Sequence, residues 1–354
     1  MDNHSHRKLR VFGQRLLVRA GVKSPDAACV INHLVDANLA GHDSHGISLL
    51  PSYLDAIKSG QISLNLNPRV VSASGATSVI DGMSGFGAIC GRVAVSQAVG
   101  LAKRFGVGVV ALRNSHHLGR IGKFAELCSR LSVASIHLVN ASGGTPLVAP
   151  FNGTTARFST NPFCAAFPSS SGYSIVADFA TSVLSYGKAL EFWDRGTMPA
   201  DESIITKHGE TSKDLRHYFE AADGASALLP MARHKGYCLA VVCELFAGVM
   251  GGMARAHVWG ETYTPPSNNM FTIAVDISRF GEPTRIRAAV DALLQYIKTS
   301  ASSPGTEVQV PGEPEWKARQ QRRSEGVSIP DSTWSKLVEA GTLLGLDESV
   351  LNDA

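Results

Sequence analysis

The stretch VGVVALRNSHHLGRIG, residues 107–122, determines the fold class that we expect. It opens with a continuous apolar run, Val107–Leu112, which is typical of a buried strand. A helical pattern over residues 88–105 precedes this run, and polar residues from Asn114 onward indicate the loop that follows it. A helix, a strand and a polar loop in this order predict an α/β protein. Other strand-like runs cover residues 70–80, 134–139, 173–177 and 271–275.

Both ends of the chain predict helices instead. Ser24-Pro25-Asp26 indicates a helix start, because a serine side chain accepts hydrogen bonds from free N–H groups and proline suits the first helical position. Apolar residues then recur at helical spacing up to Leu39, and a similar pattern begins at Asp331. We expect the two ends to pack together as one helical domain.

Bulk composition excludes several classes of protein. The chain has 354 residues, of which 44% are hydrophobic and 18% charged, with a formal net charge of +3. These values are typical of a globular protein and not of a disordered one. Its lysines and arginines form no stripe interleaved with aromatic residues, so we predict no nucleic-acid partner. We interpret the basic stretch Lys317–Arg323 as a solvated helix end or loop.

The sequence also predicts a location. No apolar segment follows the polar N-terminus, so no secretory signal is expected. The longest apolar run, residues 236–253, is interrupted by Glu244 and is short for a membrane span, so we interpret it as a helix buried inside the protein. The six cysteines form no CxxC pair, which is typical of buried free thiols in a reducing compartment. We therefore predict a cytoplasmic protein without membrane contact.

The glycine-rich stretch GFGAICG, residues 85–91, follows a strand-like run and precedes a helix, as a dinucleotide-binding fingerprint does. Its spacing is GxGxxxG rather than GxGxxG. The next strand ends in Leu112-Arg113-Asn114, where the fingerprint requires an acidic residue for the ribose. We therefore favour a glycine turn that begins a helix over a cofactor site.

Two histidine-bearing loops carry groups suited to proton transfer. The first, GHDSHGI at residues 41–47, follows a helix end, and the second, residues 114–122, follows the buried strand. Histidine exchanges a proton near neutral pH, so it suits carbonyl reduction, in which the forming alkoxide takes up a proton as hydride arrives. The alternatives are a polar helix-capping loop and a metal site. We predict no metal, because the sequence has no HExxH motif and no acidic or cysteine ligands at the required spacing.

A third group of polar residues surrounds later strand-like runs. Arg157–Pro162, Asp178–Ser182 and Gly187-Lys188 combine small hydroxyl residues with an aspartate and basic residues. Such a set can hold a phosphate-bearing ligand through backbone N–H groups, hydroxyls and a point charge. Each motif alone is also typical of an ordinary turn or helix cap.

Taken in order, these motifs resemble the type-2 malate/L-lactate dehydrogenase family over nearly the whole chain. The fuller strings look like the hydroxycarboxylate dehydrogenase B branch of that family. The matching strings are GHDSHGISLLPSYL (41–54), NSHHLGRIG (114–122), VAPF (148–151), TNP (160–162), DFATS (178–182), GK (187–188), HKGY (234–237) and PGE (311–313).

The resemblance implies a non-Rossmann nicotinamide-binding fold with a mostly antiparallel central sheet flanked by helices. It divides the chain into a helical domain, residues 1–70 and 290–354, and an NAD(P)-binding and catalytic α/β domain, residues 71–289. It also implies a homodimer that interconverts 2-hydroxycarboxylates and 2-oxocarboxylates by hydride transfer with NAD or NADP.

The family's functional residues carry over onto matching positions of this chain. His45 matches the proton donor, and we expect His117 to complete the catalytic pair. The residues expected to bind the cofactor are Gly119, Arg120, Ile121, Asp178, Phe179, Ala180, Thr181, Ser182, Lys188, Lys235, Pro311, Gly312 and Glu313. The residues expected to bind the substrate are Ser44, Leu49, Tyr53, Arg157 and Asn161.

One position departs from the family pattern. Many members carry an arginine four residues after the catalytic histidine, a natural partner for a substrate carboxylate, whereas this chain has Leu49. We therefore expect aromatic or small uncharged 2-oxo acids, such as hydroxyphenylpyruvate, phenylpyruvate or glyoxylate, with Arg120 or Arg157 at the carboxylate. A core position for Leu49 is the competing expectation. Malate or lactate dehydrogenase activity, a non-catalytic dinucleotide-binding protein and a metal-dependent hydrolase stay open as alternatives.

Overall fold

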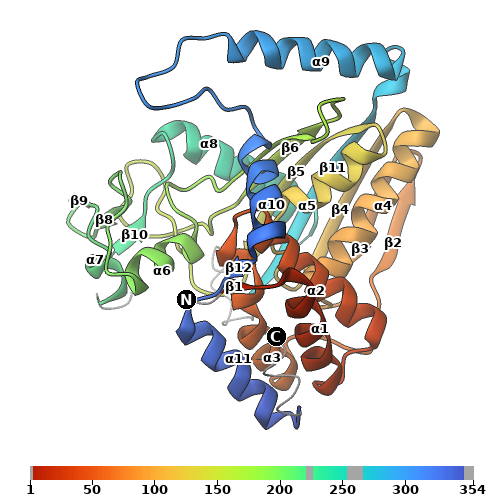
Figure 1. Cartoon of the computed structure of the whole chain (residues 1–354). Coiled ribbons are helices and arrows are strands. Elements are labelled where there is room, and N and C mark those ends of the chain that lie inside the picture. Colours follow the sequence, from red (N-terminus) through yellow and green to blue (C-terminus); the bar gives the residue numbers. More distant parts are fainter. Residues whose placement is uncertain (1–2, 221–225, 253–265, 347–354) are drawn as a thin grey trace.

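The computed structural model describes residues 3–220, 226–252 and 266–346. Its centre is a seven-stranded sheet (Figure 1). The strands follow in the order β2 (Arg69–Ser74), β3 (Thr77–Asp81), β4 (Val107–Ser115), β11 (Ser267–Asp276), β5 (Val133–Ser142), β6 (Phe163–Phe167) and β7 (Ile175–Phe179). Strands β3 and β4 pair in parallel, and the other neighbouring pairs of this sheet are antiparallel. The expected α/β class with a large central sheet is confirmed.

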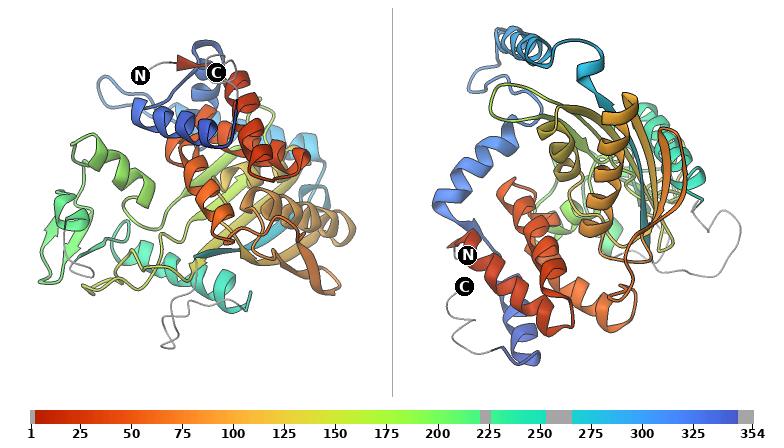
Figure 2. Two further views of the ribbon diagram at one scale, coloured as in Figure 1. Left: turned by 90° about the horizontal axis from the view of Figure 1, so that it is seen from below. Right: turned by 90° about the vertical axis from the view of Figure 1, so that its right-hand side faces the viewer.

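The central strands are apolar on both faces, because helices cover both. Val110 and Leu112 of β4 lie under α4 (Gly87–Phe105) and α5 (Gly122–Arg130), whereas Ala111 faces the opposite side. There the π-helix η3 (Glu244–Val249), which continues α8 (His234–Cys243), contacts β5 and β11 (Figure 2). Alternation of this kind follows from the two-residue period of a strand. Helices therefore pack against both faces of the sheet.

Residues 70–80 form two strands rather than the single run that we predicted. Gly75 has a φ of +53°, which a glycine adopts without strain, and it turns the chain between Ser74 and Thr77. The resulting hairpin of β2 and β3 lies at the edge of the sheet. Apolar and polar residues alternate only weakly in this run, so the sequence did not reveal the turn.

Helices from both ends of the chain share one apolar core, as expected. They are α1 (His6–Arg19), α2 (Ser24–Leu39), α3 (Leu50–Lys58) and α11 (Asp331–Leu343). Phe12, Leu34, Leu50 and Leu337 are buried together in this core. Strand β1 (Asn3–His4) also pairs with β12 (Val327–Ser328). The division into domains near residues 70 and 290 stays a prediction, and residues 347–354 of its C-terminal part lie outside the described residues.

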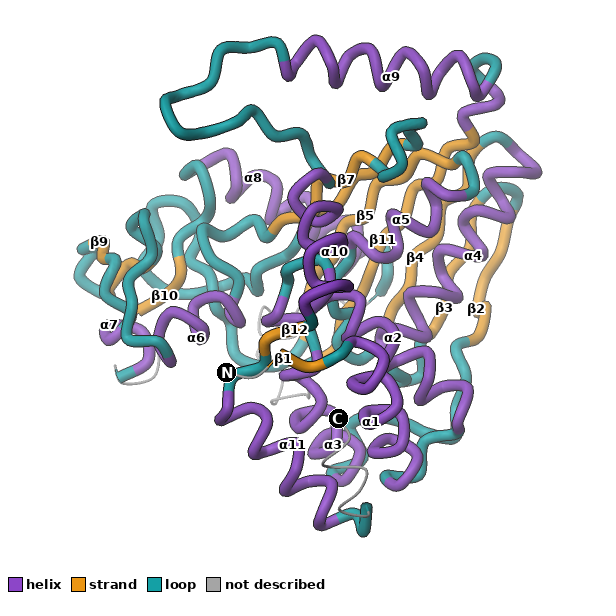
Figure 3. Tube along the Cα trace, in the orientation of Figure 1, coloured by secondary structure: helices purple, strands orange, loops and turns teal. Residues whose placement is uncertain are grey.

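A smaller peripheral layer lies beside the main sheet. A three-stranded sheet has the order β10 (Ser226–Leu228), β8 (Ile204–Thr206), β9 (Thr211–Ser212). Helices α6 (Tyr186–Asp194) and α7 (Arg216–Phe219) lie beside it. Helix α9 (Pro283–Lys298) begins after the short turn η5 (Ile277–Arg279), stands apart at the top of the molecule, and connects through a long loop to α10 (Glu313–Glu325) (Figure 3).

The basic stretch Lys317–Arg323 was wrongly predicted to be a solvated helix end or loop. It lies inside α10, and two of its arginines form ion pairs with the N-terminal helical region. Arg319 lies 2.8 Å from Asp36, and Arg322 lies 2.6 Å from Asp43. The basic residues therefore attach α10 to α2 and the loop after it.

The apolar run over residues 236–253 was wrongly predicted to be a buried helix. Its inner face, with Cys243 and Ala247, packs on the sheet, but Leu245 is 50% exposed and Val249 is 54% exposed. Met253 lies outside the described residues. None of the described helices is long and apolar enough to cross a membrane.

The thiols are only partly as expected. All six cysteines are free. Cys90, Cys128, Cys164 and Cys243 are buried, whereas Cys29 is half-buried and Cys238 is exposed on α8. The prediction that every cysteine is buried was therefore wrong for Cys29 and Cys238.

Candidate active site

A cavity of about 910 Å³ lies where the two histidine loops meet. We call it the histidine cavity. The first loop forms two short turns, η1 (Asp43–His45) and η2 (Ile47–Leu49), between α2 and α3. The predicted site residues that line the cavity are Ser44, His45, Leu49, His117, Gly119, Ile121 and Arg157.

The amide of Asn38 at the end of α2 fixes the first histidine loop. Its Nδ2 donates to Oδ1 of Asp43 at 2.7 Å, and its Oδ1 accepts from the backbone N–H of Ile47 at 2.8 Å. A Cβ at Gly46 would overlap this amide, so the position requires glycine. Arg322 of α10 donates to the same aspartate. The turn that carries His45 is thus held from both ends of the chain.

Asparagines of β11 fix the second histidine loop. Oδ1 of Asn268 accepts from the backbone N–H of Leu118 at 3.0 Å, and Oδ1 of Asn269 accepts from that of Asn114 at 2.9 Å. Sequence reasoning missed both residues. The sequence feature that could have revealed them is the pair of asparagines directly before the apolar run of β11.

The glycine stretch at residues 85–91 begins α4, as the favoured interpretation predicts. A Cβ at Gly87 would overlap the backbone carbonyl of His117, and a Cβ at Gly91 would overlap the ring of Phe124. The glycines therefore allow α4 to approach the second histidine loop and α5 closely.

His45 and His117 form a pair at the cavity wall. Their ring centroids lie 5.7 Å apart, with an angle of 22° between the ring planes. Nδ1 of His45 lies 3.1 Å from Oγ of Ser44, and Nδ1 of His117 lies 3.0 Å from the hydroxyl of Tyr53. Because each Nδ1 has a partner, Nε2 is the ring nitrogen available to a ligand in both histidines.

Burial sets the protonation state of this pair. It lowers the pKa of His45 to about 4, assisted by the nearby charges of His42 and Arg120. Burial also lowers the pKa of His117 to about 3, and it raises the pKa of Tyr53, which stays a neutral phenol. Both rings are therefore neutral at pH 7 and can accept a proton.

The cavity has one fixed positive charge. Among the lining residues that the structure describes, Arg157 is the one arginine or lysine, and none is an aspartate or glutamate. Nη1 of Arg157 donates to the backbone carbonyl of Ala156 at 2.8 Å, and the side chain is exposed. One guanidinium without an acidic neighbour suits a ligand with one carboxylate.

Leu49 lies at the boundary between the histidine cavity and the core of the terminal helices. It lines the histidine cavity and also packs against the apolar core of the terminal helices. The family's arginine position is therefore an apolar part of the wall in this chain.

Aromatic side chains form another part of the wall, which sequence reasoning missed. Tyr186 opens α6, and Tyr218 and Phe219 end α7. The ring centroid of Phe219 lies 6.2 Å from that of Tyr186 and 5.1 Å from that of Tyr218. These short elements have no periodic pattern that points to a site.

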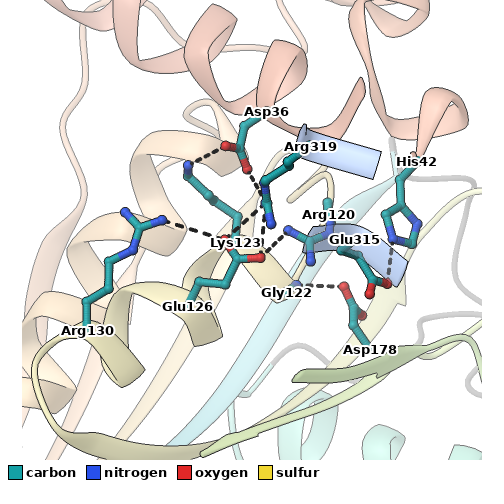
Figure 4. Close-up of polar contacts among 10 residues, drawn as sticks. All are labelled: Asp36, His42, Arg120, Gly122, Lys123, Glu126, Arg130, Asp178, Glu315 and Arg319. Atoms are coloured by element: carbon teal, nitrogen blue, oxygen red, sulfur yellow. Dashed lines mark hydrogen bonds and ion pairs between the residues drawn. The ribbon is translucent and has the colours of Figure 1, made fainter. Parts of the chain in front are cut away.

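A network of charged groups joins α2, α5 and α10 (Figure 4). Arg120 is 3% exposed and donates from Nη1 to Oε1 of Glu126 at 2.8 Å, while Nε and Nη2 have no partner among the described residues. Oδ2 of Asp178 accepts from the backbone N–H of Gly122 at 2.6 Å. Burial raises the pKa of Asp178, and the positive charge of Arg120 opposes that rise. Neither charged side chain lines the cavity itself.

Several predicted site residues support the cavity from behind. The hydroxyl of Thr181 donates to the carbonyl of Asn161, whose Nδ2 donates to Oε2 of Glu244 at 3.0 Å. Ser182 is buried and donates to the carbonyl of Leu184. These residues and Tyr53 are part of the frame and not of the lining that the structure describes.

The remaining predicted cofactor residues also lie outside the described lining of the histidine cavity. Phe179 is 38% exposed and contacts Phe163, with Ala180 partly buried beside it. Lys188 pairs with Glu191 on α6 at 2.9 Å, and Lys235 is exposed in the first turn of α8. Pro311, Gly312 and Glu313 lie at the start of α10 and are not among the described lining residues, and Gly312 and Glu313 are buried.

A dinucleotide fits the histidine cavity by three observations. The volume of about 910 Å³ is in the range of small-molecule and cofactor sites. The N-terminus of α6 contributes Ser185, Tyr186 and Gly187 to the lining, and a helix N-terminus attracts phosphate groups. The described lining has no acidic side chain to repel them.

Comparisons with known proteins agree with this picture. A family model described as malate/L-lactate dehydrogenase matches residues 4–338. Hydroxycarboxylate dehydrogenase B of Escherichia coli strain K12 is 34% identical over 345 residues, which cover 97% of this chain and 94% of that protein. L-lactate dehydrogenase of Cupriavidus necator is 33% identical over 334 residues, which cover 93% and 94%.

A solved structure has the same fold. Malate dehydrogenase from Pyrococcus horikoshii superposes with a TM-score of 0.87 at 27% identity, over 98% of this chain and 96% of that one. The family match over nearly the whole length, together with relatives above 30% identity, establishes the membership. The chain belongs to the malate/L-lactate dehydrogenase family.

Proposed function

We propose that the chain interconverts 2-hydroxycarboxylates and 2-oxocarboxylates, with NAD or NADP as the hydride carrier and His45 as the proton donor and acceptor. As a member of this family, the chain is an oxidoreductase that acts on hydroxy acids. One observation carries the proposal. The ring of His45 lies at the cavity wall, held by Ser44 through Nδ1, with Nε2 left for a substrate oxygen.

Proton transfer follows from the state of the histidine pair. In the oxidation direction, neutral His45 accepts the proton of the substrate hydroxyl at Nε2, and in the reduction direction it returns that proton to the forming alkoxide. His117 stands beside it and hydrogen-bonds to the same oxygen, while Tyr53 fixes its ring orientation. The nicotinamide ring, when bound, supplies the hydride chemistry.

The lining of the cavity supports a preference for monocarboxylates. Arg157 pairs with the carboxylate next to the reacting carbon, which uses the one lysine or arginine of the described lining. A second carboxylate would then lie against Leu49 and the aromatic wall without a partner, which costs several kcal/mol. An apolar or aromatic substituent gains about 25 cal/mol for each Å² that it buries there. Phenylpyruvate, hydroxyphenylpyruvate and glyoxylate are therefore the proposed 2-oxo acid substrates.

The cofactor residues carried over from the resemblance have separate tasks in this proposal. Gly119 and Ile121 at the cavity wall would hold the nicotinamide end. The backbone around Asp178 and the start of α6 would hold the phosphates, assisted by Lys188 and Lys235.

The proposal keeps the homodimer and the cytoplasmic location that we expect from the sequence. Helix α9 supports the homodimer, because it stands apart from the body and exposes apolar side chains. Leu293 is 56% exposed, Tyr296 is 75% exposed, and Phe280 just before the helix is 77% exposed. Sedimentation at micromolar concentration is expected to show a dimer, and a monomer alone would refute this part.

Consumption of NADH and NADPH in the presence of a panel of 2-oxo acids tests the proposed function. We expect phenylpyruvate, hydroxyphenylpyruvate or glyoxylate to give a higher kcat/KM than oxaloacetate. A preference for oxaloacetate of tenfold or more, a difference of about 1.4 kcal/mol, would contradict the substrate assignment. Cofactor binding without turnover of any 2-oxo acid would favour a non-catalytic dinucleotide-binding protein.

A further inference from the structure

A chain of side-chain hydrogen bonds runs from the π-helix η3 to the second histidine loop. At its outer end, Oε1 of Glu244 accepts from Nδ2 of Asn140 on β5 at 3.1 Å. Oδ1 of Asn140 accepts from Nδ2 of Asn269 on β11 at 2.9 Å, and Oδ1 of Asn269 accepts from the backbone N–H of Asn114 at 2.9 Å. The first residue of η3 is therefore connected to the backbone of the loop that carries His117.

Both ends of this chain impose the same direction on its hydrogen bonds. A carboxylate only accepts hydrogen bonds, and a backbone N–H only donates them. The N–H of Asn114 therefore requires Oδ1 of Asn269, which leaves Nδ2 of Asn269 to face Asn140. Oδ1 of Asn140 accepts that hydrogen bond, so its Nδ2 requires an acceptor at the position of Glu244. The carboxylate of Glu244 supplies it.

The other oxygen of Glu244 holds a second segment of the cavity wall. Oε2 accepts from Nδ2 of Asn161 at 3.0 Å, and the same Nδ2 donates to the backbone carbonyl of Ala240 at 3.2 Å. Asn161 lies between Thr160 and Pro162, which both line the histidine cavity. Each oxygen of this carboxylate therefore accepts from an amide of a different segment.

Asn161 is held in this arrangement at a cost in free energy. Its φ of +32° is uncommon for a residue with a side chain, and its buried Oδ1 has no partner among the described residues. A flipped amide would instead place Oδ1 against the carboxylate of Glu244, which repels it. Conformations that are held at a cost cluster at functional sites. Turns of π-helix, such as the one that Glu244 begins, are also frequent there.

The chain of hydrogen bonds ends at the histidine cavity. Asn140 lines this cavity, and so does Asn268, whose Oδ1 accepts from the backbone N–H of Leu118. Asn140 and Asn269 are fully buried, so water does not readily replace a hydrogen bond that either of them loses. A change at Glu244 is therefore transmitted to the wall and to the second histidine loop.

We propose that Glu244 is a positioning residue for the reaction. Its carboxylate sets the direction of the hydrogen bonds that hold Asn140, Asn161 and the second histidine loop, and through this loop it places the ring of His117. Glu244 is not among the described lining residues, so it acts through these residues and not on the substrate. The inference rests on the proposed function, which places His117 at the substrate oxygen.

Two variants separate the direction of the hydrogen bonds from the position of the carboxylate. Glu244→Gln replaces one acceptor oxygen by an amide donor, which then faces Nδ2 of Asn140 or Asn161. The double variant combines Glu244→Gln with Asn140→Asp. In it the glutamine amide donates to the aspartate, which still accepts from Asn269, and the glutamine oxygen still accepts from Asn161. The double variant thus keeps the net charge and restores every hydrogen bond of the chain.

Steady-state kinetics on the full chain measure the effect on the reaction. We expect Glu244→Gln to lower kcat for the preferred 2-oxo acid about tenfold or more, because a small misplacement of a group at the substrate has effects of this size. The affinity for NADH or NADPH should stay nearly unchanged. The double variant is expected to recover most of the lost kcat. Glu339→Gln, at an exposed glutamate of α11, is the matched control and should have the kcat of the wild type.

Amide hydrogen exchange measures the loop itself and needs no turnover. We expect the peptide over residues 114–122 to exchange faster in Glu244→Gln than in the wild type, because the N–H of Asn114 loses a fixed acceptor. In the double variant it should exchange at the wild-type rate. Helix α2 is the internal reference and should exchange equally in all variants, which separates a local effect on the loop from a loss of global stability.

Three results would overturn the proposal: unchanged exchange of the loop in Glu244→Gln, faster exchange with an unchanged kcat, or a double variant with a kcat as low as that of Glu244→Gln. If Glu244→Gln does not fold, the double variant decides. A kcat near that of the wild type then supports the proposal, and one that is about tenfold lower contradicts it. Failure of the proposed function would instead appear as absent turnover of 2-oxo acids by the wild type, with the exchange experiment still able to test the hydrogen-bond chain.

Discussion

The hydroxyl of Tyr53 lies 3.0 Å from Nδ1 of His117, on the side of the ring opposite to the nitrogen that a substrate can reach. Tyr53 is 5% exposed and belongs to the core of the terminal helices. His117, in the loop after β4, is therefore oriented by a residue of the helical region, from which His45 also comes. This contact couples the packing of the chain ends to the geometry of the site.

Tyr53→Phe removes this hydrogen bond and keeps the ring. We expect kcat to fall roughly fivefold, since a hydrogen bond of this kind contributes about 1 kcal/mol and its loss frees the ring of His117 to rotate. The affinity for the cofactor should stay nearly unchanged. Steady-state kinetics on the preferred 2-oxo acid measure the effect, with Tyr296→Phe on exposed α9 as control. Equal kcat values for both variants would contradict a positioning role for Tyr53.

Gly87→Ala tests the close approach of α4 to the second histidine loop. The added methyl group would overlap the carbonyl of His117, so we expect a loss of about 1–3 kcal/mol in the free energy of unfolding and a lower kcat. Gly100→Ala in the same helix is the matched control. Nothing lies within 4 Å of its Cβ position, and we expect it to raise stability by up to about 1 kcal/mol. Urea unfolding measures the free energy of unfolding of both variants. Equal values would contradict the close packing of α4 against the second histidine loop.

Arg157→Gln tests whether Arg157 binds the carboxylate of the substrate. We expect KM for a 2-oxo acid to rise about tenfold or more, because the neutral amide cannot form a charge-assisted pair. The control is Arg195→Gln, which changes the same charge at an ion pair on the surface of α6. Unchanged KM in Arg157→Gln would assign the carboxylate to another residue.

Local sequence patterns predicted much of the fold. Continuous apolar runs located β4 and β11, and helical periodicity located α2 and α4, because a buried strand or an amphipathic helix constrains every residue within it. The two histidine loops, which the sequence marked by their polar residues, line the same cavity. Polar groups at the ends of regular elements are a strong local signal.

Contacts between distant segments had no such signal. Arg319 and Asp36 are separated by 283 positions in the sequence. The sequence alone therefore did not show that the basic stretch of α10 has acidic partners, and we predicted it to be solvated. The aromatic wall was missed for a similar reason, because Tyr186 and Phe219 come from short, separate helices. Leu245 was predicted to be buried because apolar composition alone does not say which face of a helix meets the sheet.

Buried histidines make stability depend on pH. His137 is fully buried in β5, and burial lowers its pKa from 6.5 to about 3. The unfolded chain therefore binds a proton below pH 6.5 that the folded protein does not bind until about pH 3, so stability falls as the pH falls through this window. Between pH 7 and pH 5 this one group should cost about 2 kcal/mol. His137→Asn should lose less stability over that interval in urea unfolding, and an equal loss in both proteins would contradict the assignment.

The central claim is that His45 moves the proton. His45→Gln keeps a polar side chain of similar size but removes proton exchange, so we expect kcat for the preferred 2-oxo acid to fall roughly 10²–10⁴-fold. His208→Gln, in an exposed turn, is the matched control. The most direct measurement is kcat for both variants beside their affinity for NADH or NADPH. The account predicts a large fall in kcat for His45→Gln with cofactor affinity nearly intact, and a kcat equal to that of the wild type would contradict it.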